Sequence, residues 1–152
     1  MSVNIHASCV RIGGKGVLLL GPSGAGKSSL ALQLIDGGAK LVADDRCDLS
    51  ARGGKLYAAA PASIAGLIEL RGIGIVAMPR AKSACVAMAV QLGPHRQRLP
   101  QPAFYKPTAL LKGLRPVPLI VVDAADAAAG ALIRTALAAF GRNAFRDTFN
   151  LE

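Results

Sequence analysis

The sequence contains few aromatic residues and almost no glutamate. Among its 152 residues there are no tryptophans, two tyrosines and four phenylalanines. The core must therefore be built mainly from Ala, Val, Leu and Ile. Hydrophobic residues make up 52% of the chain, which is enough for one sizeable domain spanning residues 1–152. Glutamate occurs only at Glu69 and Glu152, so a site that needs carboxylates has few candidates.

Cysteine is also scarce, and long apolar stretches are missing. Cys9, Cys47 and Cys85 form neither a C-x-x-C pair nor a metal-ligand spacing. We expect three reduced thiols, which suits a cytoplasmic protein. No apolar stretch reaches about 18 residues, and the N-terminus lacks a secretory pattern, so a membrane span is not expected.

The chain carries a formal charge of +9, from 18 basic and 9 acidic residues. A basic surface attracts acidic proteins, phosphorylated ligands, anionic lipids or nucleic acids. The basic residues are scattered, however, and no run of Lys and Arg interleaves with aromatic residues, so nucleic-acid binding is not expected. A solvated basic surface is the simpler interpretation of this charge.

The hydrophobic pattern predicts an α/β protein. Val17 to Leu20 is wholly apolar, which is typical of a buried strand, and the glycine-rich segment 13–16 would join it to the preceding strand in a hairpin. The segment from Gly93 to Pro107 contains four prolines and is expected to form a long irregular loop. The other strands are expected at residues 3–12, 40–43, 46–50, 55–59, 67–70, 74–78, 84–92 and 119–122, and helices at 27–36 and 127–140. These elements predict a single domain with a mixed β-sheet, a helix on one face and hairpins at the edges.

The segment Gly21-Pro22-Ser23-Gly24-Ala25-Gly26-Lys27-Ser28 matches the P-loop pattern G-x-x-x-x-G-K-[ST], and we call it the phosphate cradle. It follows the apolar strand and precedes the first helix, which is the context that the pattern requires. Gly24 and Gly26 permit the backbone to turn its amides toward phosphate oxygens. The phosphates would then lie at a helix N-terminus. Lys27 offers a positive charge to the outer phosphates and Ser28 a hydroxyl to Mg²⁺.

Three acidic residues are candidates for the remaining chemistry. Asp44 and Asp45 stand where a strand ends, which is a usual place for acids in an α/β nucleotide site. Because neighbouring residues of a strand point to opposite sides, one of the two should face the phosphates. Solvated turn residues are the alternative. Glu69 is the lone acid of an apolar stretch, and either Mg²⁺ or Arg71 could be its partner.

His6 becomes a candidate through hairpin geometry. A turn centred near Gly14 would pair Leu20 with about residue 9 and bring His6 opposite residues 22–23, beside the phosphate cradle. A surface histidine with no such role is the alternative.

Several segments together resemble HPr kinase/phosphorylase. They are Ile5-His6, Gly16 to Ser28, Leu41-Val42-Ala43-Asp44-Asp45-Arg46 and Glu69-Leu70-Arg71-Gly72-Ile73-Gly74-Ile75. A P-loop alone is common, whereas a P-loop followed by Val-Ala-Asp-Asp-Arg and Glu-x-Arg-Gly-x-Gly-Ile is far more specific. The resemblance is clearest over residues 3–80, and it is to the C-terminal catalytic domain, so the chain looks like a short form of the family.

The resemblance implies a phosphoenolpyruvate-carboxykinase-like P-loop fold and a known reaction. Members of the family transfer a phosphoryl group from ATP, with Mg²⁺, to a serine of the phosphocarrier protein HPr, and can reverse this with inorganic phosphate. Carried over, Asp45 would be the base toward the serine, Lys27 would steady the phosphates, Ser28 and Glu69 would hold Mg²⁺, and His6 would be the active-site histidine. A cytoplasmic role in regulating a sugar or nitrogen phosphotransferase system, and a homo-oligomer (hexameric in the family), are implied as well.

One family feature is missing from the sequence. The later Pro-Val-Arg-Pro-Gly-Arg-Asn loop, which supplies a catalytic arginine, is not found, and spacing does not choose among Arg71, Arg80 and Arg115 as its replacement. Two other functions therefore remain open, a small-molecule P-loop kinase and a non-catalytic ATP-binding regulatory protein. A GTPase is not expected, because the N-K-x-D motif is missing.

Overall fold

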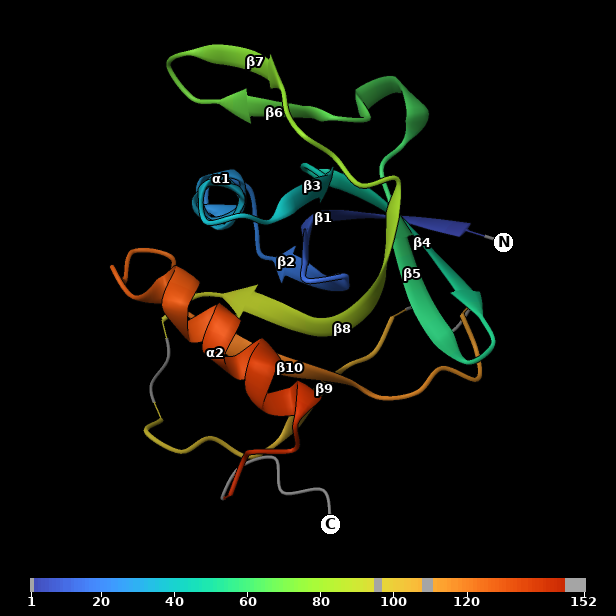
Figure 1. The fold of residues 1–152 in the computed structure, drawn as a ribbon, viewed down its shortest axis with the longest axis vertical. Helices are drawn as coiled ribbons and strands as arrows, with labels where there is room; N and C mark the ends of the chain where they lie inside the picture. The colour runs from blue at the N-terminus through green and yellow to red at the C-terminus, as the bar shows by residue number, and fades with distance from the viewer. Residues whose placement is uncertain (1, 95–96, 108–110, 147–152) are drawn as a thin grey trace.

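A computed structural model describes residues 2–94, 97–107 and 111–146, and it contains a large mixed sheet, a separate hairpin and two α-helices (Figure 1). The elements in chain order are β1 (Ser2–Ile12), β2 (Lys15–Leu20), α1 (Lys27–Asp36), β3 (Lys40–Ala43), β4 (Arg46–Arg52), β5 (Lys55–Ala59), the 3₁₀ turn η1 (Ala62–Ile64), β6 (Leu67–Leu70), β7 (Gly74–Ala77), β8 (Ser83–Leu92), β9 (Ala103–Tyr105), β10 (Val117–Val122) and α2 (Ala129–Gly141). The fold class predicted from the sequence is confirmed.

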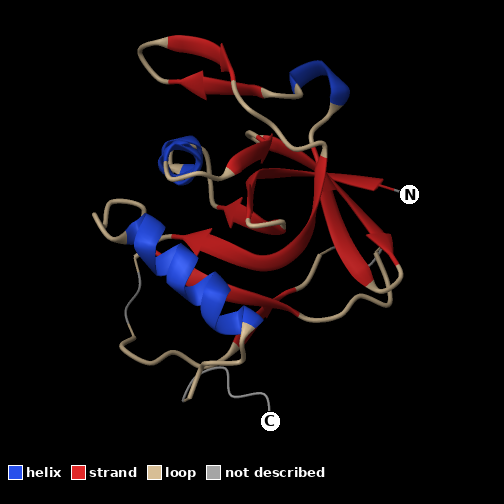
Figure 2. Cartoon of the chain, viewed as in Figure 1, coloured by secondary structure: helices blue, strands red, loops and turns tan. Residues whose placement is uncertain are grey.

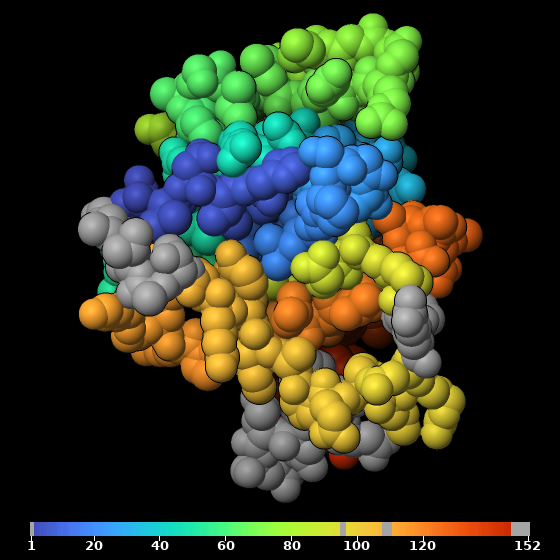
Figure 3. All heavy atoms as spheres, turned by 180° about the vertical axis from the view of Figure 1, so that it is seen from behind, coloured from blue at the N-terminus to red at the C-terminus, as the bar shows by residue number. Residues whose placement is uncertain are grey.

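The large sheet closes partly on itself. Its strand order is β2-β1-β4-β5-β8-β10-β9, with β3 also paired to β1, and β2 also pairs with β8. Strands β2, β1, β4, β5 and β8 thus form a closed ring. The β6–β7 hairpin is a separate two-stranded sheet, and it stands at one end of the molecule in both views (Figures 1 and 3).

Strand β2 is apolar from Val17 to Leu20 because both of its faces lie in the core. The two α-helices lie on one side of the strands (Figure 2), where Leu30 and Leu34 of α1 and Ile133 of α2 pack against alternate residues of the sheet such as Val17. The intervening residues, including Leu18, belong to a second apolar cluster, which also contains residues of β4, β5 and β8. None of the helices among the described residues is both long and apolar enough to cross a bilayer.

The β1–β2 hairpin is tighter than the sequence suggested. Gly13 and Gly14 form a two-residue turn with φ of 55° and 83°, as expected for the turn type that matches strand twist. Leu20 therefore pairs with Ala7 instead of residue 9, so the predicted register was wrong by two residues. His6 consequently lies next to the end of β2 and not opposite residues 22–23.

The segment from Gly93 to Pro107 was expected to be a long irregular loop, but part of it forms a strand. Its residues 103–105 form β9, which pairs antiparallel with the start of β10, with Val117 opposite Tyr105 and Leu119 opposite Ala103. A strand of three residues has too little pattern of its own to be predicted, and it exists only because β10 offers it a free edge. Residues 95 and 96 of this segment lie outside the described residues.

Candidate functional site

The phosphate cradle joins the carboxyl end of β2 to the first turn of α1. Gly24 and Gly26 have φ of 83° and 102°, a region of the backbone map that residues with a side chain rarely enter. A Cβ atom at Gly26 would also lie 3.0 Å from Cβ of Ala124, in the segment between β10 and α2. The cradle thus needs glycine both for its conformation and for its contact with that segment.

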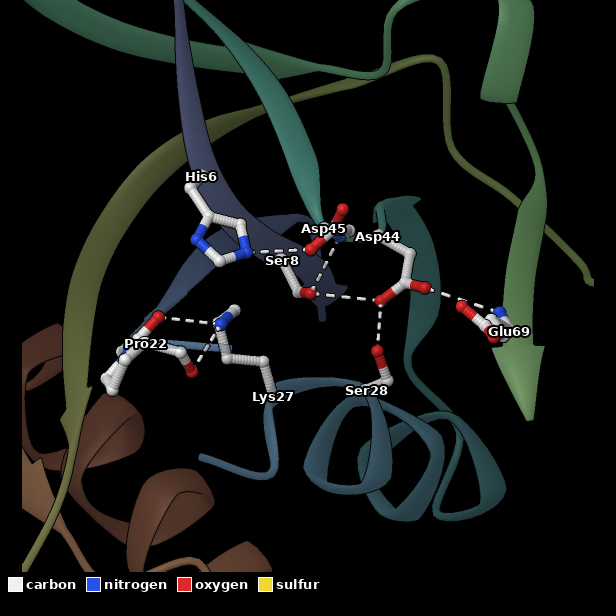
Figure 4. A network of polar contacts seen from close by, with 9 residues as sticks. His6, Ser8, Pro22, Lys27, Ser28, Asp44, Asp45 and Glu69 are labelled. Carbon is white, nitrogen blue, oxygen red and sulfur yellow. Dashed lines mark hydrogen bonds and ion pairs between the residues drawn. The ribbon is translucent and has the colours of Figure 1, made fainter. Parts of the chain in front are cut away.

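Lys27 is buried against the cradle, with 6% of its surface exposed. Its Nζ atom donates to the main-chain oxygens of Gly21 (2.6 Å) and Pro22 (3.0 Å), as Figure 4 shows. A buried ammonium group requires such acceptors, and here the loop itself provides them. The lysine charge is therefore held at the mouth of the loop where phosphate oxygens would lie.

Asp44 is the buried acid of the pair, with 7% of its surface exposed. Its Oδ1 accepts hydrogen bonds from Oγ of Ser28 (2.7 Å) and from Oγ of Ser8 (3.0 Å), and its Oδ2 accepts one from the amide of Glu69 (3.3 Å). These contacts join β1, α1 and β6 around one carboxylate. The hydroxyl at the end of the cradle is thus held by an acid from a different part of the chain.

The side chain of Asp45 points in a different direction from that of Asp44, because the chain makes a tight turn at Asp45. Its φ is 69°, and the amide of Arg46 donates to the carbonyl of Asp44 at 2.8 Å, as in a γ-turn. Its side chain is 65% exposed, and its Oδ1 lies 2.7 Å from Nε2 of His6. Backbone strain of this kind is common at functional sites.

Ser8 was not recognised from the sequence, although it lies at the centre of this network (Figure 4). It is fully buried on β1, where its hydroxyl donates to Asp44 and accepts from the amide of Asp45 at 3.1 Å. The signal that could have found it is a single hydroxyl in the apolar run from Ala7 to Val10.

Glu69 reaches the site through its backbone, since its amide contacts Asp44 while its side chain is exposed. The alternative of a Glu69–Arg71 ion pair is not observed among the described residues. Within the described ranges no three His, Cys, Asp or Glu side chains form a metal-binding group. The oxygen donors near the cradle are instead the paired Ser28 hydroxyl and Asp44 carboxylate. Oxygen atoms of this kind fit Mg²⁺, which usually binds one or two carboxylates together with water and phosphate.

The thiols near this site are not candidates for nucleophiles. Burial raises the pKa of the Cys47 thiol to about 12, and burial together with the neighbouring Cys47 raises the pKa of the Cys9 thiol well above its usual range. Both groups therefore stay protonated at neutral pH, and a protonated thiol is a poor nucleophile.

Comparison with known proteins agrees with the resemblance. Residues 1–84, which are more than half of the chain, match the family described as HPr Serine kinase C-terminal domain. This chain belongs to that family. Among curated relatives, the HPr kinase/phosphorylases of Clostridium tetani and Caldanaerobacter subterraneus subsp. tengcongensis are 44% and 49% identical over 75 residues. Each match covers 49% of this chain but 25% of the relative, so the chain matches about a quarter of the length of these proteins.

The structural similarity extends further along the chain. The solved structure of the Hpr(Ser) kinase/phosphatase from Coxiella burnetii superposes with a TM-score of 0.72 and 29% identity, covering 93% of this chain and 95% of that one. The structural match therefore includes most of the part beyond residue 84, where the family match ends.

In this HPr serine kinase fold, the segment beside the cradle is residues 123–128, between β10 and α2. It appears in orange beside the blue cradle segment in Figure 3. It contains no arginine, and the carboxylates of Asp123 and Asp126 accept hydrogen bonds from the amides of Ala125 and Ala128. Of the arginines considered as replacements, Arg115 lies near the start of β2, at the opposite end of that strand from the cradle. Arg71 and Arg80 are exposed near the β6–β7 hairpin.

Proposed function

We propose that this protein is an ATP- and Mg²⁺-dependent protein serine kinase that phosphorylates an HPr-type phosphocarrier protein. The observation that carries the proposal is that two adjacent acids have different surroundings. Asp44 is buried and bonded to the cradle hydroxyl of Ser28, whereas Asp45 is exposed and oriented by His6. One acid thus belongs to the nucleotide side of the site and the other is accessible to an acceptor.

In the proposed reaction the cradle amides and Lys27 hold the β- and γ-phosphates of ATP. Bound Mg²⁺ would neutralise part of the phosphate charge, and the Ser28 hydroxyl and the Asp44 carboxylate are the groups that would hold it. Glu69, the other ligand that the resemblance implies, contacts Asp44 through its amide, and its exposed carboxylate would turn toward the metal. Phosphoryl transfer depends mainly on such positioning and charge neutralisation.

Asp45 is the proposed general base. Its Oδ1 is occupied by His6, which leaves Oδ2 available to accept the proton of an acceptor serine. The serine oxygen then bonds to the γ-phosphorus while the bond from that phosphorus to the bridging oxygen breaks, and ADP leaves. In the reverse reaction an oxygen of inorganic phosphate would bond to the phosphoserine phosphorus while the bond from that phosphorus to the serine oxygen breaks. Asp45 would return a proton to the serine oxygen, and pyrophosphate would leave.

The test is transfer of label from [γ-³²P]ATP to serine of a purified HPr-type carrier, in the presence of Mg²⁺. Asp45→Asn should lower the transfer rate by about 10²–10⁴-fold while ATP binding is retained, because general-base catalysis contributes factors of this size. Asp44→Asn is the matched comparison, and it should instead weaken the Mg²⁺-dependent binding of ATP. A carrier with its acceptor serine replaced by alanine controls for the site of labelling.

Three outcomes would contradict the proposal. Transfer at the wild-type rate by Asp45→Asn would remove this residue from the mechanism. Labelling of small hydroxylated compounds but not of the carrier would indicate a small-molecule kinase. Binding of ATP without turnover on any acceptor would indicate a regulatory nucleotide-binding protein. The homo-oligomer and the cytoplasmic role expected from the resemblance belong to the same proposal, and gel filtration tests the first of them.

A further inference from the structure

An open pocket lies at the Lys15 end of β2, opposite to the end of that strand that leads into the phosphate cradle. Strand β8 pairs with β5 along residues 83–85 and with β10 along residues 89–92, so residues 86–88 form no ladder with either. The pocket has a volume of about 330 Å³ and is open to solvent. Its walls come from the two glycine turns of the β1–β2 and β4–β5 hairpins, from β8 and from residues 115–117. We call it the β8 pocket.

Three cations line the β8 pocket, namely Lys15, Lys55 and Arg115. No carboxylate lines it among the described residues. The acids of the described part of the chain are Asp36, Asp44, Asp45, Asp48, Glu69, Asp123 and Asp126. The side chains of the three cations make no hydrogen bond or ion pair with any described residue. Like charges around one concave surface repel each other, and an anion between them would remove that repulsion.

The main chain holds two of these cations in place. The amide of Arg115 donates to the carbonyl of Gly54 at 2.8 Å, which fixes the segment before β10 to the turn that precedes Lys55. The Arg115 side chain runs across Gly54, since a Cβ atom there would lie 3.9 Å from its Nε. Lys15 is held differently, because its ammonium lies against Gly141 at the C-terminal end of α2, where helix carbonyls carry partial negative charge. Arg115 and Lys55 are therefore the principal charges facing the pocket.

We propose that the β8 pocket binds a small multivalent anion, a phosphate ester or a polycarboxylate, at a site separate from the phosphate cradle. A guanidinium group recognises both chemistries with two parallel hydrogen bonds, and lysine adds charge without strict geometry. The separation follows from the fold, since the six residues of β2 span roughly 20 Å between the two sites. The proposal does not depend on the kinase reaction.

The pocket provides its own reporter. Cys85 lines it and is partly exposed, whereas Cys9 and Cys47 are fully buried, so a thiol reagent should react with Cys85 alone in the native protein. We expect pyrophosphate and citrate to slow this reaction by about tenfold or more, while potassium chloride at matched ionic strength does not. The two anions represent the two sources of the shared chemistry. Lys27→Met, which weakens the phosphate cradle, should leave the protection of Cys85 unchanged.

Variants of the lining residues test whether the anion binds in the β8 pocket. The double variant Lys55→Gln with Arg115→Gln should raise the anion concentration for half-protection by at least about tenfold, since each charge-assisted hydrogen bond contributes a factor of this size. Both side chains are exposed, so the fold should be retained, which circular dichroism checks. Lys112→Gln is the matched control, because Lys112 is exposed nearby but does not line the pocket. Calorimetric titration with citrate gives a second readout that needs no thiol chemistry.

The proposal would be overturned if the double variant needed the same anion concentration for half-protection of Cys85 as the wild-type protein. Equal protection of Cys85 by chloride would overturn it as well. So would the lack of any binding heat in the wild-type protein. Loss of protection in Lys27→Met would assign the anion to the phosphate cradle instead and would likewise contradict a separate site. Failure of the β8 pocket in these tests would leave the kinase proposal untouched, because the labelling of a carrier serine is measured independently.

Discussion

The hydroxyl of Ser8 lies 3.0 Å from Oδ1 of Asp44 and, on its other side, 3.1 Å from the amide nitrogen of Asp45. A hydroxyl can donate once and also accept, and this one does both. It therefore fixes the direction of the Asp44 carboxylate and supports the γ-turn at Asp45 at the same time. One buried atom of β1 keeps the two acids pointing to different sides of the site.

Ser8→Ala should affect catalysis more than nucleotide affinity. The change removes one donor to Asp44 and leaves the amide of Asp45 without its acceptor, which should lower the free energy of unfolding by about 1–3 kcal/mol. Because Asp45 would no longer be held in its turn, we expect kcat for the carrier to fall by about tenfold or more, with a smaller change in KM for ATP. Urea unfolding and steady-state kinetics measure the two effects.

The matched control for this change is Ser29→Ala, because Ser29 is exposed on α1. It should alter stability by no more than about 0.5 kcal/mol, as surface changes usually do. If Ser8→Ala kept the wild-type kcat while losing stability, Ser8 would have a structural role alone.

His6 should act by orienting Asp45, so the type of substitution matters. His6→Ala removes the partner of Oδ1 of Asp45, whereas the side-chain amide of His6→Gln can still donate to it. We expect phosphoryl transfer to fall by about tenfold or more in His6→Ala and by clearly less in His6→Gln. Binding of ATP should be the same in both variants. Equal rates for the two variants would show that the contact does not contribute to transfer.

Much of the fold could be predicted from the sequence, because the decisive patterns are local. The apolar run before the phosphate cradle, the two Gly-Gly hairpin turns and the periodic α2 each predict one element within a few residues. Strand β9 could not be predicted, since its three residues are held only by pairing with β10. The closure of the sheet through β2 and β8 is likewise a contact between distant segments.

Part of the candidate site could also be predicted, because some of its residues lie in local sequence patterns. The cradle residues are contiguous in sequence, and Asp44 and Asp45 follow a strand, so their positions could be inferred. The γ-turn at Asp45 could not be, because it results from contacts with Ser8 and Ala7 on another strand. Ser8 itself was missed because the two partners of its hydroxyl lie 36 and 37 positions away in the sequence.

Gly26 should tolerate a side chain less well than Gly24. Both have positive φ, which costs a residue with a Cβ atom roughly 1–2 kcal/mol. A Cβ at Gly24 meets open space, whereas one at Gly26 lies 3.0 Å from Cβ of Ala124. Gly26→Ala should therefore weaken ATP binding more than Gly24→Ala, as measured by calorimetry. Adding Ala124→Gly to Gly26→Ala removes the steric part and should restore some of the affinity, and no restoration would mean that backbone strain alone accounts for the loss.

The buried thiols should make the protein sensitive to alkaline pH. Burial raises the pKa of Cys47 from 9.0 to about 12, so between these values the unfolded chain has lost this proton while the native protein retains it. Since the native state then binds more protons, the free energy of unfolding falls as the pH rises, by up to about 1.4 kcal/mol per pH unit for one thiol. Below pH 9 this contribution is fully present, and Cys9 acts in the same direction because its pKa is also raised.

Urea unfolding at pH 7.5, 9 and 10.5 measures this loss. We expect a decrease of about 1–3 kcal/mol between the last two conditions in the wild-type protein. Cys47→Ala should be less stable at neutral pH, because it leaves a small cavity, but its stability should decline less steeply above pH 9. Cys85→Ala is the control, since Cys85 is partly exposed and its replacement should leave the slope unchanged. Identical slopes for Cys47→Ala and the wild-type protein would mean that other groups, such as lysines and tyrosines, cause the alkaline loss.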